Sequence, residues 1–144
     1  SRGLGDVYKR QAFMLGAKAV QMGTRFVVAD ESIVNEAYKD RIIVAKDIDS
    51  AVTGRSHGHP VRSLRNAMTR EYSKLEAEGK SFEELEYLTL GTLRKAVIEG
   101  DIVHGTVMAG QIAGLVSKKQ SAKEIIDEII SEATNLLKNA GSLV

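Results

Sequence analysis

A glycine and a threonine directly follow a short apolar segment, in the sequence AVQMGTRF at residues 19–26. Glycine allows a backbone to approach a ligand closely, and two successive amides at a helix entrance can donate hydrogen bonds to phosphate oxygens. The hydroxyl of Thr24 would add a third donor. Gly23 and Thr24 are therefore candidate phosphate-binding residues, and an ordinary tight turn is the alternative that this pair alone leaves open.

Two of the three histidines are spaced as metal ligands can be. His57 and His59 would lie on the same side of an extended segment. The chain has no cysteine, and the nearest acids, Asp47 and Asp49, are only loosely placed, so nothing completes a ligand set. We expect no metal site, a plain loop around His57, and a half-exposed His104.

Composition argues against several classes of partner. Twenty basic residues against nineteen acidic ones give a formal charge of +1, which offers no electrostatic footprint for nucleic acid or an anionic membrane. No apolar run approaches the roughly 20 residues that span a bilayer, and no secretion signal is recognisable. The absence of cysteine excludes disulfides and thiolate chemistry. We expect a cytoplasmic protein that binds neither nucleic acid nor a membrane.

The elements that would position the candidate residues begin with one strand. The mostly apolar run at residues 19–22 predicts a strand buried in a parallel sheet, after a helix that ends at residues 12–15 with Gly16 as its cap. A second helix is expected at about residues 32–45. A loop or a short strand is expected at residues 47–54.

A longer helix is predicted to begin at Pro60, since proline is tolerated in a first turn. Arg62, Arg65 and Arg70 would lie on its exposed side, where a solvated face is the simplest interpretation. The prediction rests on apolar residues that recur at helical spacing as far as about residue 79, namely Val61, Leu64, Met68, Tyr72 and Leu75.

Two capping-box patterns mark the starts of further helices. Ser81 with Glu84 begins a helix expected to run to about residue 98. Ser121 with Glu124 begins another, whose isoleucines and leucines form one clear apolar face.

Between these two helices lies an apolar, glycine-dotted segment at residues 105–116. We expect it to be a loop that enters a tightly packed helix. Gly110 and Gly114 are then positions of close packing rather than ligand contacts.

This set of elements is incomplete as a fold. A lone buried strand needs parallel neighbours, and parallel pairing needs crossover units that these elements do not contain. We therefore expect the other strands of the sheet to lie upstream. Residues 6–11, DVYKRQ, are also the translation of GAT GTG TAT AAG AGA CAG, which resembles a transposon end used to prepare sequencing libraries. We interpret residues 1–11 as a non-native scar, with a natural polar tail as the alternative.

Three sequence blocks occur in a characteristic order and spacing. They are GAKAVQMGTRFVVADES at 16–32, GHPVR at 58–62 and GTVMAGQIAGLVS at 105–117. Together they resemble the flavin-dependent enoyl-acyl carrier protein reductases, and more loosely the related nitronate monooxygenases, formerly called 2-nitropropane dioxygenases. The resemblance covers about residues 12–138, and the second block with Arg65 and Asn66 favours the reductase branch.

The resemblance implies an α/β fold, the C-terminal part of a (β/α)8 barrel with an inserted, mainly helical lid. The last barrel strand and its phosphate loop would occupy residues 12–30. The lid, or substrate domain, would occupy residues 31–103, and C-terminal barrel helices would occupy residues 104–144. Phosphate sites recur in such barrels at the loops after the last two strands.

The resemblance also implies the cofactor contacts. Gly23 and Thr24 would hold the phosphate of FMN. Met108 would pack against the flavin ring or the acyl chain, with a role as core filler as the alternative. Gln111 would hydrogen-bond the cofactor or a substrate carbonyl. The resemblance places the catalytic histidine in the upstream half of the barrel, so no catalytic residue is expected in this chain.

On the substrate side, the resemblance puts His59 near the mouth of the substrate pocket. Arg62 is a second candidate on this side. With its neighbouring arginines it would dock the acidic acyl carrier protein, or the phosphates of the carrier's prosthetic arm.

The implied reaction passes hydride from NADH or NADPH to FMN and then to the β-carbon of an enoyl thioester carried by acyl carrier protein or CoA. A monovalent cation is a further cofactor that the resemblance suggests, and a homodimer is among the expected assemblies. Two rivals stay open. One is oxidation of nitronates with FMN and O2, and the other is a non-catalytic fragment without a stable flavin site. Taken alone, the 144 residues are expected to be inactive and poorly soluble.

Overall fold

The computed structural model describes residue 19 and residues 21–140 of the chain. The helix expected to end at residues 12–15 lies outside these residues. Of the strand expected at residues 19–22, Ala19, Gln21 and Met22 have no regular secondary structure, and residue 20 is outside the described part. A parallel strand forms only against hydrogen-bonding neighbours, and the described residues place no strand beside this segment.

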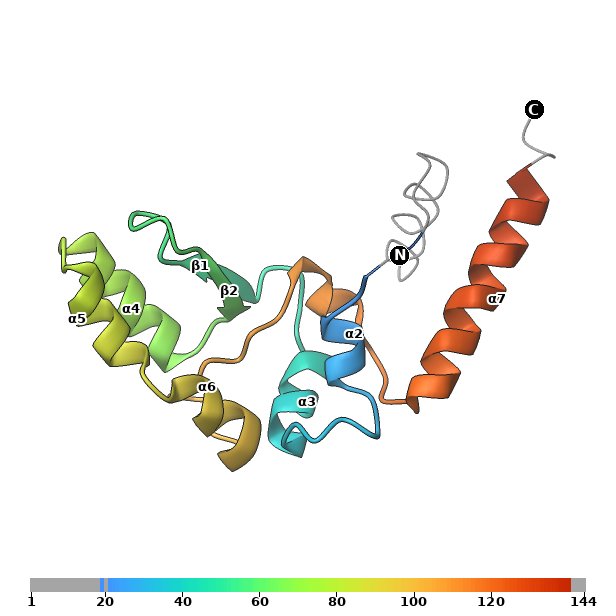
Figure 1. Ribbon diagram of the computed structural model, residues 1–144, viewed down its shortest axis with the longest axis horizontal. Helices are drawn as coiled ribbons and strands as arrows, with labels where there is room; N and C mark the ends of the chain where they lie inside the picture. Colours follow the sequence, from blue (N-terminus) through green and yellow to red (C-terminus); the bar gives the residue numbers. More distant parts are fainter. Residues whose placement is uncertain (1–18, 20, 141–144) are drawn as a thin grey trace.

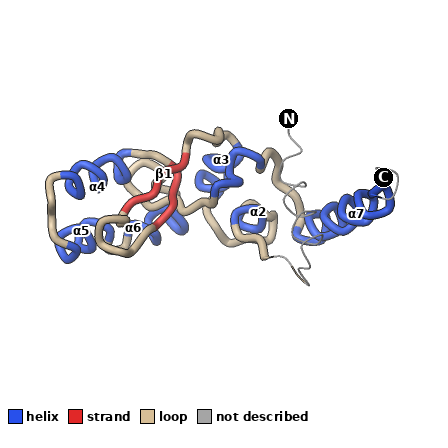
Figure 2. The backbone as a smooth tube through the Cα atoms, turned by 90° about the horizontal axis from the view of Figure 1, so that it is seen from above, coloured by secondary structure: helices blue, strands red, loops and turns tan. Residues whose placement is uncertain are grey.

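The described part is elongated, with a lobe at each end of a central layer (Figure 1). One end holds the hairpin β1 (Ser50–Thr53) and β2 (Val61–Leu64) with helices α4 (Ala67–Ala77) and α5 (Phe82–Thr89). The middle holds α2 (Thr24–Val27) and α3 (Glu36–Ile43). Helix α7 (Ala122–Ala140) stands at the far end, as the view from above also shows (Figure 2).

The main hydrophobic core lies in the central layer. It joins α2, α3 and β2 to the segment that leads into the short 3-10 helix η2 (Gln111–Leu115). Burying an aliphatic side chain completely stabilises a fold by about 1.5–3 kcal/mol, so this core holds segments that are far apart in sequence. Its buried members are Val28, Tyr38, Ile42, Ala45, Leu64, Ala96, Val107, Ala109, Ala113 and Val116.

The hairpin lobe has a smaller core of its own. Met68 and Tyr72 of α4 pack against Leu85 of α5, with Leu75 and Leu88 at the edge. Strand β1 runs antiparallel to β2, with Ser50 opposite Leu64. A short helix α6 (Thr92–Arg94) and a π-turn η1 (Lys95–Glu99) return the chain to the central layer.

The prediction that a helix begins at Pro60 is wrong for the residues before Ala67. Residues 61–64 form strand β2, and the helix α4 begins only after Asn66. Val61 and Leu64 fit a helical period equally well, but their backbone pairs with β1 and Asn66 supplies the capping box. As a consequence Arg62 lies on a strand and Arg65 in a loop, so they do not share a helix face with Arg70.

Other boundaries follow local signals more closely. The capping boxes of Ser81 and of Asn66 are both formed. At the start of α7, the Ser121 hydroxyl accepts a hydrogen bond from the Glu124 amide. The helix after Ser81 ends at Thr89 rather than near residue 98, because Gly91 adopts a left-handed conformation with φ 75°.

Two further predicted helices are shorter in the structure than expected. The helix expected at about 32–45 is shorter and begins after Asn35, whose side chain caps α3. The segment 105–116 is extended and then only a 3-10 turn, since Gly110 and Gly114 interrupt it. Close packing at Gly114 is confirmed, because a Cβ there would lie 2.3 Å from Asp47 Oδ1.

Candidate functional site

The two sequence blocks predicted to bind the cofactor meet at one hydrogen bond. The amide of Gly110 donates to Thr24 Oγ1 at 2.8 Å, across 86 residues of chain. Thr24 is buried, with 8% of its surface exposed. A threonine hydroxyl accepts and also donates, so its own proton is left to donate to a further group. The bond therefore fixes Thr24 without using up its donor.

The space beside Gly23 is open. A Cβ built on Gly23 would meet no described heavy atom within 4 Å, and its φ of −98° is accessible to any residue. The backbone conformation therefore does not explain glycine at this position. Among the described residues, the main chain at Gly23 has free space beside it. Gly23 and Thr24 lie at the entrance of α2, which has only four residues, so the helix dipole contributes little there.

The segment Val107–Gln111 crosses the central layer beside this turn. The Val107 carbonyl accepts the amide of Leu64 at 2.8 Å, and the amide of Ala109 donates to the Arg62 carbonyl at 3.4 Å. Val107 and Ala109 point into the core. Met108, between them, is 40% exposed. This exposure argues against the alternative that Met108 fills the core of the described residues.

Gln111 is exposed at the first position of η2. Its side-chain amide makes no hydrogen bond to another described residue. It therefore keeps two donors and an acceptor for a ligand. Met108, Thr24 and Gln111 flank Gly110, so the structure brings together all four residues predicted to bind the cofactor.

A tyrosine that the sequence analysis did not single out joins this arrangement. The Tyr38 hydroxyl, on α3, donates to the Met108 carbonyl at 2.7 Å. Burial raises the pKa of Tyr38 to about 12. The only sequence signal was the spacing of Tyr38 and Ile42, which predicts burial but says nothing about the partner of the hydroxyl.

The two substrate-side candidates are placed differently. The Arg62 backbone adjoins the Met108 segment, while its guanidinium donates to Ser50 Oγ at 2.9 Å within the hairpin. His59 belongs to the hairpin loop, where its ring lies 4.6 Å from that of Phe82 on α5. The structure thus links Arg62 to the candidate site through its main chain and links His59 to the lobe of α4 and α5.

His57 and His59 do not form a metal site with their neighbours. His57 Nδ1 lies 2.9 Å from Ser56 Oγ and 4.0 Å from Glu76 Oε1. Among the described residues, no group of three or more His, Cys, Asp or Glu side chains is placed to hold a metal ion. His104 is exposed rather than half-exposed.

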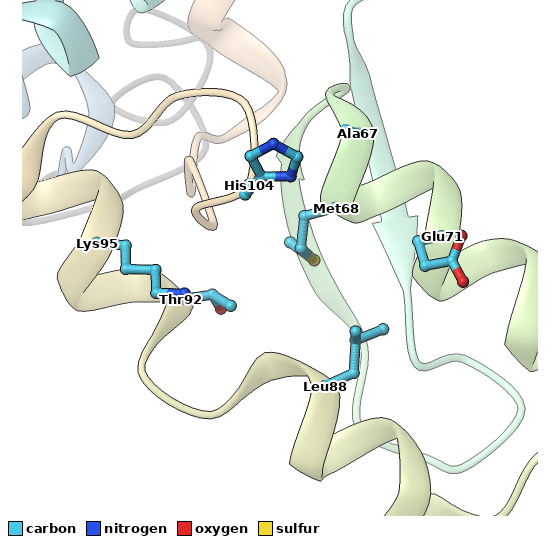
Figure 3. Close-up of a pocket in the computed structure, with 7 residues that line it drawn as sticks. All are labelled: Ala67, Met68, Glu71, Leu88, Thr92, Lys95 and His104. Carbon is cyan, nitrogen blue, oxygen red and sulfur yellow. The ribbon is translucent and has the colours of Figure 1, made fainter.

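A separate pocket of about 350 Å³ contains none of Thr24, Met108 and Gln111 (Figure 3). It opens between α4, α5 and α6, beside the loop that carries His104. Its charged side chains are Glu71, Lys95 and His104, and none of the predicted site residues belongs to it. The full lining is Ala67, Met68, Glu71, Leu88, Thr92, Lys95 and His104.

Comparison with known proteins shows the family. The sequence matches the nitronate monooxygenase family over residues 5–132, and the chain therefore belongs to it. This is a family of flavoprotein oxidoreductases that use FMN. The matched range begins inside the segment interpreted as a non-native scar, and that interpretation stays a prediction.

Two curated relatives indicate the range of the family. A probable nitronate monooxygenase of Staphylococcus saprophyticus is 29% identical over 126 residues, which cover 88% of this chain and 35% of that protein. A Mycobacterium tuberculosis protein is 26% identical over 171 residues, covering 92% of this chain and 48% of its own length. Its name is (3aS,4S,5R,7aS)-5-hydroxy-7a-methyl-1-oxo-octahydro-1H-indene-4-carboxyl-CoA dehydrogenase. The chain thus spans between a third and a half of these relatives.

Solved structures show the fold. FabK from Thermotoga maritima superposes with a TM-score of 0.88 at 40% identity, over 94% of this chain and 43% of that one. A nitroalkane oxidase from Streptomyces ansochromogenes gives a TM-score of 0.73 at 22% identity, over 92% of this chain and 38% of that one. The chain is part of a (β/α)8 barrel with an inserted, mainly helical lid. No helix among the described residues is long and apolar enough to cross a membrane.

Proposed function

We propose that the protein containing this chain is an FMN-dependent reductase that uses NAD(P)H to reduce enoyl thioesters carried by acyl carrier protein or CoA. The observation that carries the proposal is the hydrogen bond from Gly110 to Thr24, which joins the two blocks that resemble the reductases. The 40% identity to FabK, an FMN enoyl-acyl carrier protein reductase, supports it.

The described residues fit the cofactor. Thr24 keeps a free hydroxyl donor, Gly23 leaves open space beside the main chain, and Gln111 has an uncommitted amide. In the proposal, Gly23 and Thr24 hold the FMN phosphate. Gln111 donates to the flavin or to the substrate carbonyl, and Met108 lies against the ring or the acyl chain.

The bound flavin supplies hydride transfer between the nicotinamide and the β-carbon of the enoyl group. In the proposal, the residues of this chain bind the flavin and the substrate and orient them. Thr24 donates its proton to a phosphate oxygen while the amide of Gly110 fixes its rotamer. Arg62, Arg65 and Arg70 are proposed to attract the acidic carrier or its phosphates, although they lie on three separate segments. His59 is proposed to line the entrance for the acyl chain. A monovalent cation and a homodimer are further parts of the proposal.

Oxidation of nitronates with O2 is the second candidate. The family match and the name of the staphylococcal relative favour it. Both candidate activities would use the same binding site for the FMN phosphate, so the contacts of Thr24 do not distinguish between them. The two activities differ in their substrate. A third candidate is that the chain by itself is a fragment without catalytic activity.

The test is made on the purified product of the complete gene. NADH and NADPH oxidation are followed without O2, with and without an enoyl thioester, and O2 uptake is followed with an alkyl nitronate. The proposal expects oxidation of the nicotinamide that depends on the thioester. Nitronate-driven O2 uptake without thioester reduction would instead establish the second candidate.

Replacement of Thr24 tests directly whether its hydroxyl binds the FMN phosphate. A hydrogen bond to a charged group contributes about 1.5–3 kcal/mol, so Thr24→Val should raise the FMN Kd by about 10- to 100-fold. Thr24→Ser keeps the hydroxyl and should bind FMN nearly as the parent does. Fluorescence quenching of FMN measures both, and equal affinities of the two variants would remove Thr24 from the site.

A further inference from the structure

The backbone of Met108–Gly110 is held from three sides by three different elements. The Tyr38 hydroxyl on α3 donates to the Met108 carbonyl at 2.7 Å. The amide of Ala109 donates to the Arg62 carbonyl on β2, and the amide of Gly110 donates to the Thr24 hydroxyl on α2. The segment itself belongs to no helix and pairs only through a single bridge between Ser63 and Met108. Its conformation therefore depends on these contacts.

Among the described residues of the lid, Tyr38 is the one whose side chain hydrogen-bonds to this segment. Its ring is 3% exposed and packs in the central core with Ile42. Rotation of the hydroxyl away from the Met108 carbonyl would break this partly buried hydrogen bond, which is worth about 0.5–1.5 kcal/mol. Burial raises the pKa of Tyr38 to about 12, so the hydroxyl stays protonated and donating at neutral pH.

We propose that Tyr38 is a positioning residue, which fixes the Met108 carbonyl and thereby directs the exposed Met108 side chain and Gln111 toward the ring of the cofactor. The inference rests on the proposed function for what Met108 and Gln111 contact. The phosphate is held separately by Gly23 and Thr24. Loss of the Tyr38 hydroxyl should therefore disturb the ring end of the site and spare the phosphate end.

Tyr38→Phe in the complete protein tests this division. The variant keeps the ring in the core and removes only the donor. We expect kcat/KM for the enoyl thioester to fall by about fivefold, while the FMN Kd changes by less than about twofold. The visible spectrum of bound flavin should shift, because the ring loses a fixed neighbour. A purely structural role would lower the melting temperature without moving the spectrum.

The matched control is Tyr72→Phe. Tyr72 is a second buried tyrosine, 7% exposed, in the separate core of the hairpin lobe. It should leave the flavin spectrum and kcat/KM unchanged. A double-mutant cycle with Met108→Ala adds a second control, since Tyr38→Phe should have little further effect once the Met108 side chain is gone.

Amide hydrogen exchange separates this inference from the proposed function. In Tyr38→Phe a peptide covering residues 107–111 should exchange at least about fivefold faster, whereas the same peptide in Tyr72→Phe should not. Unchanged exchange in Tyr38→Phe overturns the inference. If the parent protein binds no FMN, the proposed function fails, and the exchange comparison still decides whether Tyr38 holds the segment.

Should Tyr38→Phe fail to fold, 3-fluorotyrosine at position 38 provides a second variant. It keeps the hydroxyl and makes it a stronger donor. It should slow exchange of the peptide at residues 107–111 relative to the parent. No change in exchange would overturn the inference in this variant as well.

Discussion

Thr24 holds two distant segments together and still has a hydroxyl proton to donate. Its oxygen accepts the amide of Gly110, and its proton is left to donate elsewhere. Gly23 beside it is not required by backbone conformation, since its φ is −98°. At this scale the sequence already singled out Gly23 and Thr24 as candidates for phosphate binding, which stays a prediction. It did not show that residue 110 would be the group that holds Thr24 in place.

Glu76 is a second residue whose role depends on a distant segment. Its carboxylate, on α4, accepts from the Ser56 hydroxyl at 2.6 Å and from the amides of Ser56 and Gly54 at 3.2 and 3.3 Å. These bonds, first among them that of the Ser56 hydroxyl, hold the pKa of Glu76 below its ordinary value of 4.5. Glu76 thereby anchors the hairpin loop that carries His57 and His59.

Glu76→Gln should loosen the hairpin loop at neutral pH and have little effect in acid. A carboxyl with a lowered folded-state pKa stabilises the fold above its unfolded pKa, and this contribution is lost as the pH falls through the folded value. We expect the amides of Gly54 and Ser56 to lose about 1 kcal/mol of protection at pH 7. The difference between variant and parent should shrink as the pH falls below 4.5 and through the lowered pKa of Glu76. Hydrogen exchange at pH 7 and in acid measures it.

Glu86→Gln provides the control, because Glu86 is an exposed acid on α5. It should leave the protection of the loop unchanged at both pH values. A loss of protection in Glu76→Gln that persists undiminished in acid would contradict the role of the carboxylate charge.

At the scale of elements, helix boundaries are decided by caps, and the caps are not equivalent. Ser81 caps α5 at the surface. Asn66 caps α4 while buried, and its side-chain nitrogen also donates to the carbonyls of Ile102 and Gly105 at 2.9 and 2.7 Å. Asn66 therefore joins the hairpin lobe to the chain that leads to the candidate site.

Asn66→Ala should destabilise the protein far more than Ser81→Ala. Loss of an N-cap costs about 1 kcal/mol. The lost bonds to one buried and one partly buried carbonyl bring the expected cost for Asn66→Ala to about 3 kcal/mol. Ser81→Ala should lower the free energy of unfolding only by about 1 kcal/mol, through loss of the N-cap. Urea unfolding of both variants gives the comparison. Equal midpoints would show that the bonds to Ile102 and Gly105 contribute nothing.

The strand β2 illustrates where periodicity misleads. Val61 and Leu64 are three residues apart, which suits a helix face. In the structure the main chain from 61 to 64 pairs with β1, and the Leu64 amide also donates to the Val107 carbonyl. A four-residue segment carries too little pattern to choose between a helix and a strand. The choice is made by these hydrogen-bond partners, which lie 8 to 43 residues away.

At the scale of the whole molecule, large apolar side chains remain at the surface of the described residues. They occur on both ends and in the middle of the chain. Contiguous exposed apolar surface marks contacts with other protein. The most exposed are Ile33 at 88%, Tyr87 at 82%, Ile48 at 78%, Leu90 at 75%, Val44 at 66% and Ile130 at 60%.

We therefore predict that the 144-residue chain, expressed alone, self-associates. Light scattering during size-exclusion chromatography should show particles heavier than the monomer mass of 15.6 kDa. Substituting Ile130→Lys on α7 should reduce the association without changing the helix content measured by circular dichroism. A monodisperse monomer with one sharp cooperative unfolding transition would contradict the prediction.

The sequence by itself determined the residue types that can bind the cofactor, the capping boxes of Ser81 and Ser121, and the family resemblance that the comparisons confirm. These are local properties, encoded within a few neighbouring residues. The tertiary structure alone decided that Thr24 meets Gly110, that Tyr38 holds Met108, and that residues 61–64 are a strand. These contacts join residues that are 8 to 86 positions apart in the sequence. A local sequence pattern does not specify which distant residue becomes the hydrogen-bond partner.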